Sequence, residues 1–142
     1  MERLLRVIVA GSRTVIDYMI VREMLLSFMR DHPDVKITWI SGRAAEGPDD
    51  MAYHFAKWDV ESDVIEMKAK WDENGRGAGF IRNAEMAEIG DELILAWDGR
   101  SHGSKHMRDT MRKLSKTIHA RVVNVEDQAG QFEVFDFTRI AT

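Results

Sequence analysis

Apolar residues in this chain gather into short runs that alternate with amphipathic segments. The runs at residues 4–10, 36–41, 63–67, 92–97 and 121–125 are rich in aliphatic and β-branched side chains and are short enough to be strands. They lack a regular polar alternation, which indicates strands that are buried on both faces, as in a parallel sheet covered by helices.

Between these runs, apolar residues recur at helical spacing. From a cap at Asp17, the residues Ile20, Met24 and Phe28 recur every four positions and predict a helix that ends near Arg30. Further helices are predicted over residues 49–58 with a cap at Asp49 or Asp50, over 80–89 after a glycine-rich loop at 74–79, and over 104–116.

Strands and helices that alternate in this way are typical of the α/β class. We therefore predict a Rossmann-like three-layer sandwich, in which a mainly parallel sheet of about five to six strands carries helices on both faces. The length suits a single domain over residues 1–142. Its tail, residues 127–142, contains several phenylalanines and is expected to add an edge strand or to contact a second copy.

Composition excludes several function classes. The 142 residues contain no cysteine, which rules out a disulfide scaffold, a cysteine-ligated metal centre and a thiol nucleophile. Twenty Lys and Arg residues against 24 Asp and Glu residues give a net charge of −4, so nucleic acid is not expected as a partner. The sequence shows neither an apolar run of membrane-spanning length nor a signal core, so we expect a soluble cytoplasmic protein with its native N-terminus and no membrane partner.

Three predicted strands end in loops of small residues, and a helix follows each loop. In a parallel sheet these loops lie at one edge, where ligands bind. Glycines let backbone amides approach a ligand closely, and a helix N-terminus adds unpaired N–H groups and partial positive charge, a combination that suits phosphate. A P-loop and a dinucleotide fingerprint are both absent, so neither an ATPase nor a dehydrogenase is expected. The loops are Gly11-Ser12-Arg13, Ser41-Gly42-Arg43 and residues 98–104.

The candidate ligand-binding residues come from these loops and from the segment before the fourth strand. Trp71 either stacks on a base or packs in the core. Arg82 is expected to contact a phosphate or carboxylate, because an unpaired buried cation is costly and the sequence shows no acidic partner at helical spacing except Glu85, which can face solvent. The candidate set is Gly11, Ser12, Arg13, Ser41, Gly42, Asp49, Trp71, Arg82, Asn83, Asp98, Gly99, Ser101, Gly103 and Ser104.

Seven short motifs follow one another along the chain. They are Gly11-Ser12-Arg13, Ser41-Gly42, Gly47-Pro48-Asp49, Trp71-Asp72, Gly77-Ala78-Gly79, Arg82-Asn83 with Met86, and the stretch from Trp97-Asp98-Gly99 to Met107. In this order they resemble the YspA/YpsA-related branch of the SLOG superfamily, which also holds the LOG phosphoribohydrolases and the DprA/SMF proteins. The resemblance covers roughly residues 6–125, and many members of this branch come from phages and mobile elements. It implies a Rossmann-like fold and a pocket for a nucleotide or a nucleotide-derived ligand.

The chain departs from this branch in its second loop. The usual pattern there is Gly-Gly-Ala-x-Gly-Ala-Asp, whereas this chain has one additional residue and Arg43 in place of the second glycine. The departure suggests that this loop carries a different ligand group.

Comparison with the LOG enzymes leaves catalysis open. Met107 stands where those enzymes have a catalytic glutamate, a carboxylate that helps N-glycosidic cleavage by stabilising the cationic sugar or activating water. If the protein is an enzyme, Arg82 would hold the phosphate or the leaving group, and Asp49, Asp72 or Asp98 would supply the carboxylate.

The sequence thus favours a binder of an ADP-ribose-like or NAD-like compound or a nucleoside phosphate, acting as a sensor or a sequestering protein. One alternative is a hydrolase of an N-glycosidic or phosphate bond in such a ligand, and another is an interaction protein with a vestigial pocket. No cofactor is expected. A metal site is not expected either, because His102 and His106 are four residues apart but have no neighbouring carboxylate that completes a metalloprotease motif.

Three features of the sequence bear on which side chains are buried, exposed or in contact with another copy. The first predicted helix is apolar around much of its circumference and rich in methionine, a pattern that favours contact with a second copy of the chain. The SLOG resemblance also implies pairing through helices, so we expect a homodimer or a higher homo-oligomer. Trp39, Trp58 and Trp97 are assigned to core packing. The basic stretch over residues 105–121 is interpreted as a solvated helix face.

Overall fold

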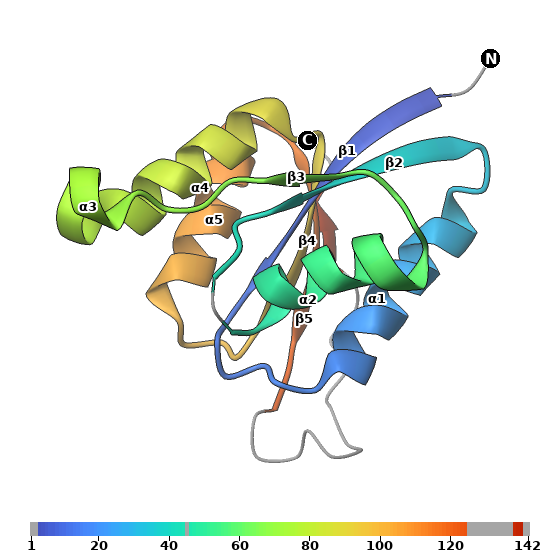
Figure 1. Ribbon diagram of the computed structural model, residues 1–142, viewed down its shortest axis with the longest axis horizontal. Helices are drawn as coiled ribbons and strands as arrows, with labels where there is room; N and C mark the ends of the chain where they lie inside the picture. The colour runs from blue at the N-terminus through green and yellow to red at the C-terminus, as the bar shows by residue number, and fades with distance from the viewer. Residues whose placement is uncertain (1–2, 45, 125–137, 141–142) are drawn as a thin grey trace.

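A six-stranded sheet forms the centre of the molecule in the computed structural model, which describes residues 3–44, 46–124 and 138–140 (Figure 1). The strand order is β3-β2-β1-β4-β5-β6; the first five strands are parallel, and β6 runs antiparallel to β5. The strands are β1 (Arg3–Gly11), β2 (Val35–Ser41), β3 (Val64–Glu66), β4 (Glu92–Trp97), β5 (Thr117–Val122) and β6 (Thr138–Ile140).

Helices cover both faces of this sheet (Figure 1). On one face lie α1 (Tyr18–Asp31) and α2 (Pro48–His54), and on the other lie α4 (Ala78–Ile89) and α5 (His102–Lys113). The predicted Rossmann-like α/β class is therefore confirmed.

Each face of the sheet has its own hydrophobic core. Alternate residues of β1 point to opposite faces, so Val7 and Val9 pack in the core under α1 and α2, and Ile8 packs in the core under α4 and α5. Trp39 is 0% exposed and packs in the first of these cores, so its predicted place in the core is confirmed.

The strand order reverses between β1 and β4. The chain moves outward from β1 through β2 to β3, and then returns to pair β4 with the free side of β1. Gly11 and Ala96 are opposite each other near the carboxyl ends of these two strands, and the Ser12 N–H donates to the Ala96 carbonyl at 3.0 Å. The loops after β1 and β4 therefore lie side by side at the topological switch point, where open α/β sheets bind ligands.

The first helix is capped as predicted, since the Asp17 side chain accepts a hydrogen bond from the Met19 N–H. The predicted cap of the second helix is wrong. Gly47, with φ at +87°, holds the N-cap position, and Asp49 and Asp50 lie in the first turn of α2.

The second helix also ends differently from the prediction. It continues as a π-helical turn over Phe55–Asp59, in which the Val60 N–H donates to the Phe55 carbonyl five residues before it. The additional residue in this turn shifts the helical periodicity, so Ala56 is buried while Trp58 is 74% exposed. The assignment of Trp58 to the core is wrong for this reason.

Three other predicted boundaries are corrected. The expected glycine-rich loop is largely helical, with α3 (Trp71–Asn74) and a 3-10 turn over Gly75–Gly77 leading into α4 at Ala78. Helix α5 begins at His102 and not at residue 104, because Ser101 is its cap. It also ends at Lys113, because Ser115 turns the chain at φ +58°, so β5 starts at Thr117, before the predicted residue 121.

The predicted edge strand is confirmed at β6, and the phenylalanines of the tail lie outside the described residues. Within the described part of the chain, every helix is too short or too polar to cross a membrane. Helix α1 buries Met24 and Leu25 in the protein's own core, and Met19 is exposed. The expected homo-oligomer stays a prediction.

Candidate functional site

A cavity of about 360 Å³ lies at the carboxyl ends of β1 and β4. This volume is in the range of small-molecule sites, and the position is the switch point of the sheet. The loop after β1, the first turns of α2, α4 and α5, and α3 all contribute to its wall. The predicted ligand-binding residues that line it are Gly11, Ser12, Arg13, Asp49, Trp71, Arg82, Asn83, Asp98, Ser101, Gly103 and Ser104.

A pair of buried serines lies on the inner side of this cavity. The hydroxyl oxygens of Ser12 and Ser104 are 3.3 Å apart, and both residues are less than 5% exposed. Ser104 lies in the first turn of α5, whose cap Ser101 accepts a hydrogen bond from the Ser104 N–H at 3.4 Å. The positive end of a 12-residue helix and two hydroxyls therefore meet here, as is typical of a phosphate site.

The Asp98 side chain stabilises the loop after β4 through hydrogen bonds. Its carboxylate accepts hydrogen bonds at 2.8 Å from the Thr14 hydroxyl and from the N–H groups of Arg100 and Ser101. Burial by itself would raise the pKa of Asp98, but these hydrogen bonds outweigh it and hold that pKa below its ordinary value. Asp98 is therefore ionised at neutral pH, and its carboxylate already has three donors.

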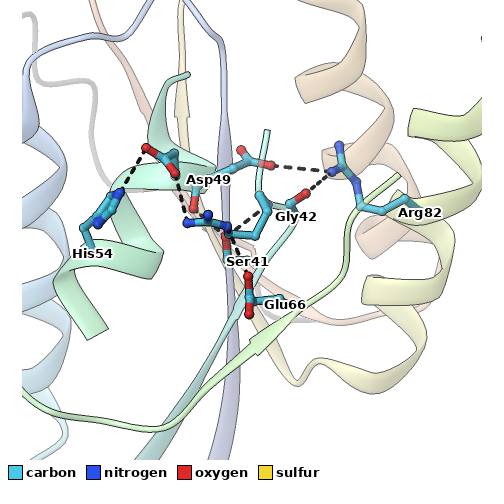
Figure 2. A network of polar contacts seen from close by, with 8 residues as sticks. Ser41, Gly42, Asp49, His54, Glu66 and Arg82 are labelled. Carbon is cyan, nitrogen blue, oxygen red and sulfur yellow. Dashed lines mark hydrogen bonds and ion pairs between the residues drawn. The ribbon is translucent and has the colours of Figure 1, made fainter. Parts of the chain in front are cut away.

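Arg82 reaches the cavity from α4. Its Nη1 donates to the Gly42 carbonyl at 2.7 Å and lies 4.0 Å from Asp49 Oδ2, as Figure 2 shows. The guanidinium side chain is only 14% exposed. The prediction that Arg82 lies at the crevice is confirmed. Its acidic partner is Asp49, which the fold brings in from α2 and which no helical spacing in the sequence could reveal.

Asp49 is the buried carboxyl of this site. Removal from water is the main influence on it and raises the pKa of Asp49 to about 6, while Arg82 and a hydrogen bond from the Gly11 backbone act in the opposite direction. Figure 2 shows its carboxyl directed toward Arg82, next to Gly42. A carboxyl with this pKa can take up or release a proton close to neutral pH.

Two aromatic side chains with large exposed surfaces line the cavity. Trp71 is 52% exposed and Phe80 is 48% exposed, so Trp71 is not a core residue. Phe80 stacks on His106 with ring centroids 4.1 Å apart, and Asn83 Nδ2 donates to the Gly103 carbonyl at 3.1 Å and lies 3.2 Å from His106 Nδ1. Asn83 and His106 thus hold the Phe80 ring and the first turn of α5 together.

Several predicted residues lie away from this cavity. Ser41 is fully buried, and its hydroxyl donates to the Asp49 carbonyl at 2.5 Å, which fixes the start of α2. Gly99 does not line the cavity, and neither does the exposed Asp72 on α3. Trp97 is half-buried and packs against the core under α4 and α5, as predicted, and its indole N–H donates to the Ser101 carbonyl at 3.2 Å.

Seven of the lining residues are not among the predicted site residues: Ala10, Thr14, Ala44, Arg76, Gly79, Phe80 and Met107. Thr14 follows one predicted loop directly and Arg76 lies within another, so their place in the loops was an available signal. Met107 is 1% exposed and lines the cavity. The position that holds a glutamate in the LOG enzymes that the sequence resembles is therefore part of the cavity wall. Among the described residues, no three His, Asp or Glu side chains are grouped to hold a metal ion.

No model of a known protein family matches this chain. The chain is similar to the Gene 61 protein of Mycobacterium phage D29, with 32% identity over 114 residues. The match covers 75% of this chain and 89% of the phage protein. With this identity over most of both sequences, the chain belongs to the same family as the Gene 61 protein of Mycobacterium phage D29.

Proposed function

We propose that this protein binds a nucleotide or a nucleotide-derived ligand at the cavity beyond β1 and β4, as a sensor or a sequestering protein. The observation that carries the proposal is the meeting of a phosphate-type subsite and an aromatic subsite in one cavity of about 360 Å³. A nucleotide needs both, because it joins an anion to a flat apolar ring.

The phosphate end of the ligand lies at the N-terminus of α5. There the Ser12 and Ser104 hydroxyls, the helix dipole and the nearby Arg82 guanidinium all favour an anion. Asp98 does not oppose this strongly, because its carboxylate accepts hydrogen bonds from two N–H groups of its own loop and from the Thr14 hydroxyl of the loop after β1.

The base of the ligand lies against the exposed aromatic rings. Stacking of a base on an aromatic side chain contributes about 1–3 kcal/mol in single-stranded nucleic-acid complexes. The half-exposed Trp71 and Phe80 offer such surfaces. The resemblance to the SLOG superfamily, whose pocket takes nucleotide-derived ligands, supports the same assignment.

Isothermal titration calorimetry on the full chain tests this function. The panel contains AMP, ADP-ribose, NAD and cyclic oligonucleotides. We expect at least one compound to bind with a dissociation constant in the micromolar range or below. Folded protein that binds none of them would contradict the proposal and favour an interaction protein with a vestigial pocket.

A second candidate function is hydrolysis of such a ligand, and Asp49 is the observation that favours it. A buried carboxyl whose pKa is raised to about 6, 4.0 Å from an arginine, is suited to general acid or base chemistry. Chromatography after incubation with nucleoside monophosphates and NAD tests this function. Release of a free base or of phosphate that is lost in Asp49→Asn supports it, and unchanged substrates at high enzyme concentration exclude it for those compounds.

A further inference from the structure

A second cavity, of about 440 Å³, adjoins the first. The two share the residues Arg13, Ala44, Trp71 and Arg82, so they meet at a common wall. The second cavity extends toward the ends of β2 and β3, and away from the N-terminus of α5. Its own residues are Gly42, Arg43, Glu46, Lys68 and Ala69.

The second cavity is strongly basic. Four cationic side chains line it, against the single carboxylate of Glu46; they are Arg13, Arg43, Lys68 and Arg82. Arg43 and Arg82 already have acidic partners, but Arg13 and Lys68 are exposed and form no ion pair within the described part of the chain. Two cations therefore remain available to a ligand in this cavity.

Arg43 is fixed in place as part of this wall. Its guanidinium pairs with Asp50 at 3.1 Å and with Glu66 at 3.2 Å, and it lies 3.8 Å above the centroid of the Tyr53 ring. Figure 2 shows Glu66 reaching this network from β3, beside Ser41 and Gly42. The backbone of Arg43 has φ at +52°, a left-handed conformation that is strained for a residue other than glycine, so these contacts offset a local strain.

The two cavities together discriminate between classes of nucleotide. A nucleoside monophosphate has one anionic group, and the N-terminus of α5 in the first cavity already offers a place for it. Arg13 and Lys68 would then be left without an ion-pair partner, and Arg13 stands at the junction where the next phosphate of a chain would lie.

We propose that the ligand is a nucleoside diphosphate, free or esterified to a further group, whose second phosphate lies between Arg13, Arg82 and Lys68. This inference rests on the proposed function, since it specifies the ligand of the same site. It selects a diphosphate ligand over a nucleoside monophosphate.

Calorimetry with AMP, ADP and ADP-ribose, and with GMP and GDP, tests the inference. EDTA is present to remove divalent metal ions, so that only the cationic side chains of the protein interact with the phosphates. The variant is Lys68→Gln. The matched control is Lys70→Gln, an exposed lysine two residues further on that lines neither cavity. ADP and ADP-ribose separate a free diphosphate from an esterified one.

We expect the diphosphate compounds to bind about 10-fold or more tightly than the monophosphate of the same base, and Lys68→Gln to weaken them about 5-fold to 10-fold. Lys68→Gln should leave monophosphate affinity within about 2-fold, and Lys70→Gln should leave all affinities within that range. If AMP or GMP binds as tightly as the diphosphates, the inference is overturned and the proposed function stands. If none of the five compounds binds to folded protein, the inference is overturned, and the proposed function is overturned with it when NAD and the cyclic oligonucleotides also fail to bind.

Discussion

Asp49 and Arg82 come from opposite faces of the sheet and approach each other at Gly42. Asp49 Oδ2 lies 4.0 Å from Arg82 Nη1, and the same nitrogen donates to the Gly42 carbonyl at 2.7 Å. A Cβ atom on Gly42 would lie 2.4 Å from Arg82 Nη1 and 2.7 Å from Asp49 Oδ2. The loop after β2 therefore has a glycine because the cation and the carboxyl occupy the space of a side chain.

The first prediction concerns this close approach. Gly42→Ala should push the end of the Arg82 side chain away from the Gly42 carbonyl, because a flexible side chain moves more easily than backbone. We expect ligand affinity to fall about 10-fold, as for the loss of one charge-assisted contact. Gly77→Ala is the control, since a Cβ there meets no atom within 4 Å. Calorimetry that gives equal affinities for the two variants would contradict the role of Gly42.

The second prediction removes the cation itself. Arg82→Ala should weaken ligand binding about 10-fold to 100-fold, because a charge-assisted pair contributes about 1.5–3 kcal/mol. The control is Arg100→Ala, an exposed arginine that does not line the cavity. Unchanged affinity in a folded Arg82→Ala protein would show that the anionic group of the ligand does not contact Arg82.

The approximate strands, the parallel sheet and the edge of the sheet that carries the candidate site follow from patterns that the sequence carries. Apolar runs and helical spacing are local, and the handedness and order of a parallel sheet are narrowly restricted. These rules predict that Gly11, Ser12 and Ser104 lie at the same edge of the sheet, and all three line the cavity.

The pairing of Asp49 with Arg82 could not be predicted in this way. It depends on how far α2 and α4 reach past the end of the sheet, which is a tertiary distance and leaves no periodic signal. The exposure of Trp58 could not be predicted for a different reason, because Trp58 lies in a π-helical turn that departs from the α-helical spacing on which the prediction rests. The start of β5 was missed because a left-handed residue that is not glycine, Ser115, ends the preceding helix.

The third prediction separates two exposed tryptophans. Trp71→Ala should weaken nucleotide binding about 5-fold to 100-fold through the loss of a stacking surface, and Trp71→Phe should keep most of the affinity. Trp58→Ala is the matched control, because Trp58 is 74% exposed and does not line the cavity. Titration followed by intrinsic fluorescence measures both affinities. Equal effects of the two alanine variants would argue against a base at Trp71.

The fourth prediction concerns stability away from the site. The Lys116 ammonium donates to the carbonyls of Ala87, Glu88 and Gly90 at 2.5, 3.1 and 2.7 Å, at the C-terminal end of α4. Lys116→Met should lower the free energy of unfolding by about 1–3 kcal/mol, because these carbonyls lose a charged donor at the negative end of a helix. Urea unfolding measures the loss. The exposed Lys113→Met should change stability by less than about 1 kcal/mol, and similar losses in both variants would refute the capping role.

The fifth prediction follows from the raised pKa of Asp49, about 6 in the folded protein against an ordinary value of 3.8. Between these two values the folded state binds more protons than the unfolded state, so stability falls as pH rises from about 4 to about 6 and stays lower above that. A shift of this size corresponds to a loss on the order of 2–3 kcal/mol.

Asp49→Asn removes this titration, because an amide does not ionise in this range. Urea unfolding of both proteins at several pH values between 4 and 7.5 should therefore show the difference in unfolding free energy moving in favour of the variant as pH rises. Most of the change should occur below about pH 6.5, since the wild-type carboxyl is largely ionised above its folded pKa. Curves for the two proteins that run parallel across this range would show that Asp49 titrates normally, and Asp49 would then lose its standing as a candidate acid or base near neutral pH.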